Sequence, residues 1–174
     1  MEFVFETDYD QRALTAMARA LRKTLRRKSS LLSHILGLVI VAMAVILTIP
    51  AFSGEEFVLT VNIFVTWLAA LVIIVVVFCE DSINGYIAKK RMVMGLESSR
   101  TVFTDEGYYS ETEVGTTGWK YERIDMIADT RGYFVFLFDK SHAQVYDQSR
   151  LTGGTPAEFR RFIIEKTGKS VQNV

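Results

Sequence analysis

Two long runs without charged residues divide the chain. Residues 29–54 and 57–79 contain no Lys, Arg, Asp or Glu, and both are rich in Leu, Ile and Val. Each run exceeds the roughly 18–20 apolar residues that are needed to cross a ~30 Å hydrocarbon core. The pattern therefore predicts a membrane α-helical hairpin with spans at about 31–51 and 57–79. It excludes a purely soluble globular protein and a disordered one.

The segment before the hairpin, residues 1–30, is predicted to contain a short strand and a basic helix. The run Phe3–Phe5 consists of β formers, and Asp8 or Asp10 can cap the helix that follows. Apolar residues then recur at spacings of three and four among many arginines, which is typical of an amphipathic helix. Two interpretations stay open: a solvated helix that ends at the membrane, or a helix that lies on an anionic lipid surface.

The part of the chain after the hairpin changes character twice. Residues 80–97 are of mixed polarity and predict a helical connector. In residues 98–174, short apolar–polar alternations between turn residues predict about six antiparallel strands. Thr155 and Glu158 form the capping box of a final helix. We therefore expect an α+β cytoplasmic domain, an antiparallel sheet capped by a C-terminal helix.

The aromatic residues of this C-terminal part predict its core. Tyr133–Phe138 is apolar on both sides and should be the most buried strand. We expect Trp119, Phe134, Phe136 and Phe162 in the core, with Phe162 docking the last helix. About 75 residues are enough for one closed core. The glycines at 115 and 118 are interpreted as turn residues.

The positions of Lys and Arg predict the direction of the hairpin. Basic residues flank both ends of the hairpin on one side, whereas the connecting loop carries Glu55 and Glu56. Because basic flanks stay on the cytoplasmic side, we expect both termini in the cytoplasm and Ser53–Glu56 outside. Near an anionic leaflet each basic residue contributes about 1 kcal/mol of attraction. The predicted membrane-surface residues are Arg19, Arg22, Lys23, Arg26, Arg27, Lys28, Lys89, Lys90 and Arg91.

Polar residues within the spans give little sign of transport. His34 lies close to Lys28 and is predicted to be interfacial. Asn62 has two interpretations, a hydrogen bond across the hairpin or a mark of a solute path. No charged residue falls in the middle of either run. Since ion and proton pathways usually use such residues, a transporter or proton pump is disfavoured.

Composition and charge narrow the chemistry further. The chain has 174 residues with 20 Lys and Arg against 20 Asp and Glu, and this neutral balance argues against a nucleic-acid binder. The single cysteine, Cys79, excludes an intramolecular disulfide framework and a multi-cysteine metal site. The two histidines lack the partners of a zinc site. With no catalytic constellation in the sequence, we expect no enzyme, no cofactor and no metal.

The order of elements and several local patterns resemble a known family. Val102–Gly107 is followed by Gly118–Tyr121, an aromatic strand, and a helix that opens Thr155-Pro156-Ala157-Glu158-Phe159. Together with the hairpin, these features resemble the YcxB-like membrane proteins of bacteria over essentially the whole chain. The resemblance implies a pleckstrin-homology (PH)-like C-terminal domain, a bacterial cell membrane and no known catalytic residues. The chain departs from the family at Asp147–Arg150, where members often have a Pro-Lys/Arg turn.

Two functions from different classes fit these features. The first is a non-enzymatic, membrane-anchored interaction module that presents a PH-like domain to a cytoplasmic protein partner or to the membrane surface. The exposed sheet edges of such a domain can accept an extra strand, and Phe3–Phe5 could occupy one of them. The alternative is a bacteriocin immunity or protection protein, or an accessory subunit of a membrane transporter. The expected partners are the lipid bilayer and a protein partner or a second copy of the chain.

Overall fold

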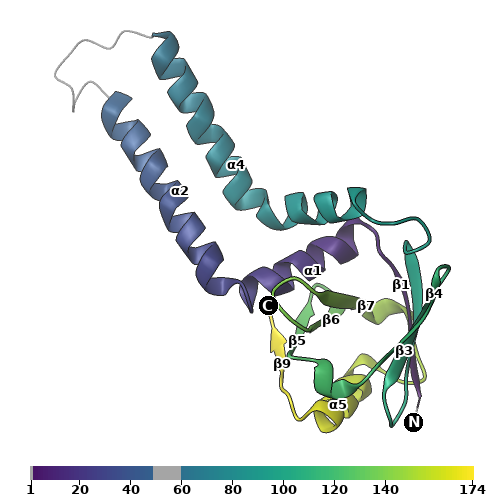
Figure 1. Ribbon diagram of the computed structural model, residues 1–174. Coiled ribbons are helices and arrows are strands. Elements are labelled where there is room, and N and C mark those ends of the chain that lie inside the picture. Colours follow the sequence, from purple (N-terminus) through teal and green to yellow (C-terminus); the bar gives the residue numbers. More distant parts are fainter. Residues whose placement is uncertain (1, 49–59) are drawn as a thin grey trace. The chain divides into compact units, whose positions relative to one another are not determined.

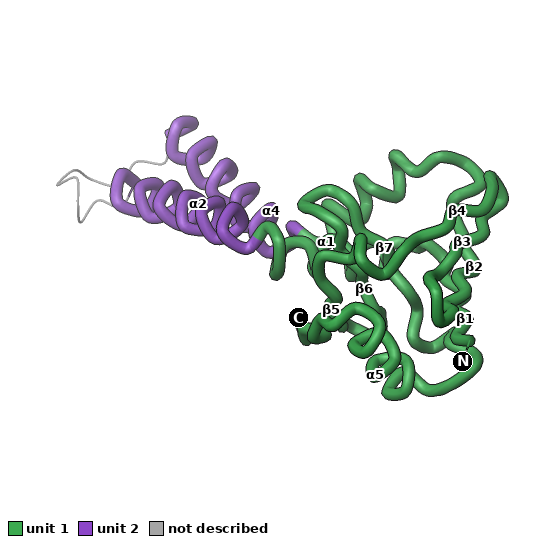
Figure 2. Tube along the Cα trace, turned by 60° about the horizontal axis from the view of Figure 1, so that its bottom comes forward, with its two compact units in different colours: residues 1–26, 81–174 green, residues 27–80 purple. Residues whose placement is uncertain are grey.

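The computed structural model describes residues 2–48 and 60–174. It divides the chain into two compact units (Figure 2). The hairpin unit is Arg27–Glu80, and the sheet unit combines Met1–Arg26 with Asp81–Val174. The predicted loop at Ser53–Glu56 and the start of the second run lie outside the described residues.

The hairpin unit is built from two apolar helices, α2 (Arg27–Thr48) and α4 (Val61–Lys90). Both are long and apolar enough to cross a membrane, with mean hydropathies of 2.5 and 2.8 over their most apolar windows. Most of their large apolar side chains are exposed, including Leu38 and Phe78. A helix in the core of a soluble protein would bury these side chains.

Small residues bring α2 close to α4. Ser30, Gly37 and Ala44 are the buried positions of α2, and they recur every seven residues. A Cβ atom on Gly37 would lie 3.3 Å from side-chain methyl groups of both Ile73 and Val77. Helices in lipid associate through close packing of this kind, because burial of apolar surface gives them no advantage. The hairpin therefore has a packed seam that the charge-free runs did not reveal.

The strands of the described residues form two sheets (Figure 1). Sheet A has the order β4-β3-β2-β1-β8, and sheet B has the order β7-β6-β5-β9. The strands of sheet A are β1 (Phe3–Asp8), β2 (Ser98–Phe103), β3 (Tyr108–Thr112), β4 (Gly115–Trp119) and β8 (Leu151–Thr152). Those of sheet B are β5 (Met126–Thr130), β6 (Tyr133–Leu137), β7 (Ala143–Asp147) and β9 (Val171–Asn173).

The N-terminal strand is an internal part of sheet A. β1 pairs antiparallel with β2, where Phe5 lies opposite Thr101, and with β8 on its other side. Phe3 and Phe5 are fully buried in the core between the sheets. Residues before and after the hairpin therefore share this core.

The helix α5 (Pro156–Thr167) covers one end of the space between the sheets (Figure 1). Its capping box forms as predicted. The Glu158 amide donates a hydrogen bond to the Thr155 hydroxyl oxygen, and the Thr155 amide donates one to the Glu158 carboxylate. Phe159 is fully buried, and its ring centroid lies 4.7 Å from that of Phe5. Phe162 docks more peripherally, against Phe3 and Tyr121.

The core predictions are confirmed for Phe134, Phe136 and Phe162, which are buried. The prediction for Trp119 is wrong, since this ring is only partly buried and stacks on Phe138 at the margin of the core. The reason is its position at the end of β4, an edge strand of sheet A. The strand Tyr133–Leu137 is buried at all but its first position, as predicted.

Two details of the sheets differ from the sequence-based prediction. The glycine-containing stretch at 115–118 belongs to β4, because Thr116 and Thr117 between the glycines favour a strand. The residues after Trp119 then form a 3₁₀ turn, η1 (Tyr121–Arg123). β9 was not predicted, and it runs parallel to β5 because α5 carries the chain back across the domain.

The basic helix α1 (Gln11–Lys23) covers the outer face of sheet B. Asp10 is its N-cap and accepts a hydrogen bond from the Ala13 amide at 2.8 Å. The apolar side chains of α1 pack on those of β5, β6 and β7. The buried residues of this contact are Ala13, Ala20, Leu21, Ala128, Val135, Leu137 and Val145. The apolar face of α1 is therefore occupied by the sheet and is not free to enter lipid.

Candidate functional site

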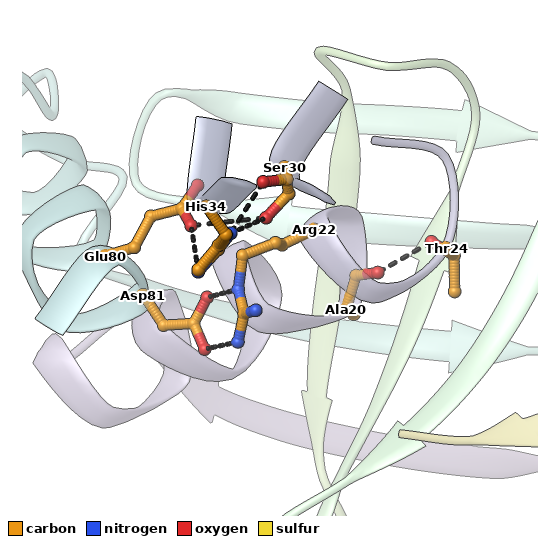
Figure 3. Close-up of polar contacts among 7 residues, drawn as sticks. All are labelled: Ala20, Arg22, Thr24, Ser30, His34, Glu80 and Asp81. Carbon is orange, nitrogen blue, oxygen red and sulfur yellow. Dashed lines mark hydrogen bonds and ion pairs between the residues drawn. The ribbon is translucent and has the colours of Figure 1, made fainter. Parts of the chain in front are cut away.

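The polar end of α4, residues 81–90, is called the exit segment because it follows the apolar run directly. It packs against α1 within the sheet unit. The Arg22 guanidinium donates two hydrogen bonds to the Asp81 carboxylate, at 2.5 and 2.7 Å (Figure 3). Paired, charge-assisted hydrogen bonds of this kind are among the stronger polar contacts in proteins.

A second contact fixes how closely α1 and the exit segment approach. A Cβ atom on Gly85 would lie 2.8 Å from the Thr15 amide nitrogen and 3.0 Å from its Cα. The two helices therefore touch through their backbones at this point, which only a glycine permits. Arg22 meets Asp81 and Thr15 meets Gly85, so the two helices run antiparallel. Lys89, further along the exit segment, lines one cleft together with Gln11 and Arg12 of the first turn of α1.

The crossing opens into a cleft of about 770 Å³. Three segments that are far apart in the sequence contribute to its wall: the start of α1, the exit segment, and the turn between β5 and β6. The residues of this basic cleft are Asp10, Gln11, Arg12, Thr15, Ser82, Lys89, Arg131 and Tyr133.

The cleft carries three cationic groups, Arg12, Lys89 and Arg131, against one carboxylate, Asp10. Within the described residues, none of these three cations lies in an ion pair with a carboxylate. Asp10 is already engaged as the N-cap of α1. The cleft therefore has an excess of positive charge that other side chains leave uncompensated.

Arg131 reaches the cleft from a backbone position that arginine rarely occupies. It has a φ of +52°, the one positive value among non-glycine residues in the described part of the chain. Gly132 follows with a φ of +84°, so both central residues of this two-residue turn are left-handed. Such turns favour Asn-Gly or Gly-Gly, because a Cβ crowds the following carbonyl oxygen.

Tyr133 gives the cleft a neutral hydrogen-bonding group. Burial raises the pKa of its phenol, and the carboxylates of Asp10 and Asp147 raise this pKa further. The hydroxyl therefore stays protonated at neutral pH and can donate to an anion. Ser82 is exposed on the exit segment and offers a second hydroxyl. Thr15 is different, since its hydroxyl already donates to the Gln11 carbonyl at 2.6 Å.

A second polar group lies at one end of the hairpin unit (Figure 3). The Ser30 hydroxyl donates to the Glu80 carboxylate at 3.3 Å, and His34 Nε2 lies 3.7 Å from the same carboxylate. His34 Nδ1 lies 2.6 Å from the Ser30 carbonyl oxygen. This group uses the polar residues at the end of the apolar runs. The Asn62 side chain is exposed, and no hydrogen bond joins it to α2 in the described residues.

The predicted membrane-surface residues fall into different environments. Arg22 is paired with Asp81, and Arg26 donates to the Lys140 carbonyl at 2.6 Å. Arg19 is half-buried, and its Nε atom lacks a hydrogen-bond partner among the described residues. The other six side chains are exposed: Lys23, Arg27, Lys28, Lys89, Lys90 and Arg91. Of the nine, Lys89 lines the basic cleft.

Sequence reasoning missed the cleft as a site. Arg12 is one of the many arginines of the predicted basic helix, and nothing in the sequence singled out Arg131. No local pattern links residues 12, 89 and 131, because the antiparallel crossing of α1 and the exit segment brings them together. Among the described residues, no three His, Cys, Asp or Glu side chains are placed to hold a metal ion.

A smaller cleft of about 320 Å³ lies beside the edge strand β4. Met17, Met92, Leu96 and Trp119 give it a more apolar wall. Within the described residues, the buried indole Nε1 of Trp119 has no hydrogen-bond partner.

A scan against protein-family models and a search of curated proteins found no match to this chain.

Proposed function

We propose that the chain is a non-enzymatic, membrane-anchored interaction module. The hairpin unit holds it in the bilayer, and the sheet unit presents its surface to a cytoplasmic partner or to the membrane surface. The observation that carries the proposal is the construction of the sheet unit from the segments on both sides of the hairpin.

This construction restricts how the chain can cross a membrane. β1 and β2 pair along Phe3–Asp8 and Ser98–Phe103, so both strands must lie on the same side. The segment between them must therefore cross an even number of times. Two apolar helices meet this requirement, and the basic residues that flank them favour a cytoplasmic sheet unit.

The helix α4 contributes residues to both units. α4 continues without interruption from the apolar run into the exit segment. There the Arg22–Asp81 ion pair and the close Gly85–Thr15 contact attach it to α1. The polar end of α4 is therefore packed as part of the sheet unit.

The sheet unit has a surface suited to a protein partner. β4 is an edge strand of sheet A, and its residues are exposed or half-exposed. An extended segment of a partner can add to such an edge through main-chain hydrogen bonds. A PH-like fold, membership of the YcxB-like family and the bacterial cell membrane as location are parts of the same proposal.

Extraction and purification test this function. After an alkaline carbonate wash, the full chain should stay with the membrane fraction, whereas a peripheral protein would be released.

A tagged chain purified from mild detergent should retain a partner protein, and replacing Thr117 in β4 by Pro should abolish the binding of that partner. Release by carbonate would refute the anchor. A stoichiometric transporter in the eluate would favour the accessory-subunit function.

A further inference from the structure

We propose that the basic cleft binds a phosphate group, supplied by the headgroup of an anionic membrane phospholipid. This source rests on the proposed membrane anchor, whereas the phosphate chemistry rests on the cleft alone. The lining supplies two guanidinium groups and one ammonium group, which are the side chains that bind phosphate oxygens most often.

The charge arrangement favours an anion over a cation or an apolar ligand. Arg12, Lys89 and Arg131 come from three separate segments and line the same cleft. The Ala13 amide at the start of α1 already donates to Asp10, so it is not available to a ligand. The protonated Tyr133 hydroxyl adds a neutral donor to the same wall.

The backbone at Arg131 is a second, independent observation. Asn or Gly would fit the left-handed position better, yet an arginine stands there. Strained positions of this kind tend to occur where a side chain serves a ligand. The turn brings Arg131 into the lining of the cleft, which it shares with Ser82 and Lys89 of the exit segment.

The chain connectivity suggests why the phosphate would belong to a lipid. Ser82 follows Cys79, the last residue of the second charge-free run, by three residues. Three residues of helix span about 4.5 Å, which places Ser82 at headgroup level if α4 crosses the bilayer. The volume of the cleft, about 770 Å³, has room for a glycerophosphate headgroup.

The test uses the full chain, purified in a non-ionic detergent, and native mass spectrometry. Three probes are titrated: dihexanoyl phosphatidylglycerol, dihexanoyl phosphatidylcholine and inorganic phosphate. We expect the anionic lipid to bind at least tenfold more tightly than the zwitterionic lipid, and this binding to weaken with added salt. Detergent removes the bilayer, so the result does not depend on whether the topology is correct.

Three variants assign any binding to the cleft. Arg131→Asn removes the guanidinium but suits the left-handed turn, so the variant should fold at least as well as the parent. Lys89→Gln removes the second cation. Both variants should bind the anionic lipid at least tenfold more weakly than the parent chain does. The matched control Arg161→Asn, at an exposed position of α5, should bind it as the parent chain does.

The outcomes separate the sources of the phosphate. Binding of inorganic phosphate that Arg131→Asn weakens, without preference for the anionic lipid, would support the phosphate site and assign it to a soluble ligand. The proposal would be overturned if no probe bound. It would equally be overturned if Arg131→Asn and Lys89→Gln bound the anionic lipid as tightly as the parent chain does.

Discussion

Gly85 shows how the absence of one side chain sets the arrangement of two helices. The Thr15 backbone lies so close that a Cβ at this position would meet main-chain atoms, which cannot move aside as a flexible side chain can. Arg131 is the opposite case, because here a large side chain is present although the left-handed backbone conformation suits glycine or asparagine. Neither property is visible in the sequence, since both depend on what the fold places next to the residue.

Replacing Gly85 by Ala should destabilise the protein by about 1–3 kcal/mol. In an ordinary helix interior, Gly→Ala stabilises by about 1 kcal/mol, but here the methyl group overpacks the crossing. Thermal unfolding of the purified full chain measures the effect. Gly118→Ala in β4 is the matched control, because nothing lies within 4 Å of its added Cβ. A higher melting temperature for Gly85→Ala would show that the crossing is looser than described.

At the scale of elements, periodicity and capping were reliable guides. The charge-free runs predicted α2 and α4, and Thr155 with Glu158 predicted the start of α5. The spacing of apolar residues in α1 predicted a helix with one apolar face but not the surface that covers it. That surface is the outer face of sheet B, and it became visible only with the long-range packing. β9 has three residues and pairs through a crossover, so no local signal marked it.

The docking of α5 should depend more on Phe159 than on Phe162. Phe159 is fully buried among aromatic rings of both sheets, whereas 9% of Phe162 remains exposed. Phe→Ala at a buried site costs about 3–5 kcal/mol, which is much of the stability of a small domain. Limited proteolysis of the full chain should therefore cut Phe159→Ala faster than Phe162→Ala. Equal rates would mean that the helix is held by both rings alike.

At the scale of the whole molecule, the sheet unit is discontinuous in sequence. Phe3 and Phe5 complete a core whose other members follow the hairpin, and α1 covers one face of sheet B. Composition suggested a division at residue 98, because the alternating strands start there. The strand Phe3–Asp8 was too short for the sequence to show which strands it joins. The basic cleft escaped prediction for the same reason, since its three cations come from segments that only the fold unites.

A soluble version of the sheet unit should fold only when both of its segments are present. We expect residues 1–26 joined to 81–174 by a flexible Gly-Ser linker to give a dispersed amide spectrum by nuclear magnetic resonance. The fragment 98–174 lacks β1 and α1, so its core would be open and its spectrum collapsed. A well-dispersed spectrum from 98–174 alone would contradict the role that the structure gives to β1.

The most direct test of the proposed membrane anchor is thiol labelling in intact cells. Cys79, the only cysteine of the chain, is first changed to Ala, and single cysteines are then introduced as Ser53→Cys and Ser170→Cys. An impermeant maleimide should label Ser53→Cys in intact cells and Ser170→Cys only after the cells are permeabilised. That result would place the sheet unit in the cytoplasm behind a hairpin that crosses twice. Labelling of Ser170→Cys but not Ser53→Cys would reverse the orientation, and protection of both positions until permeabilisation would contradict a membrane-crossing hairpin.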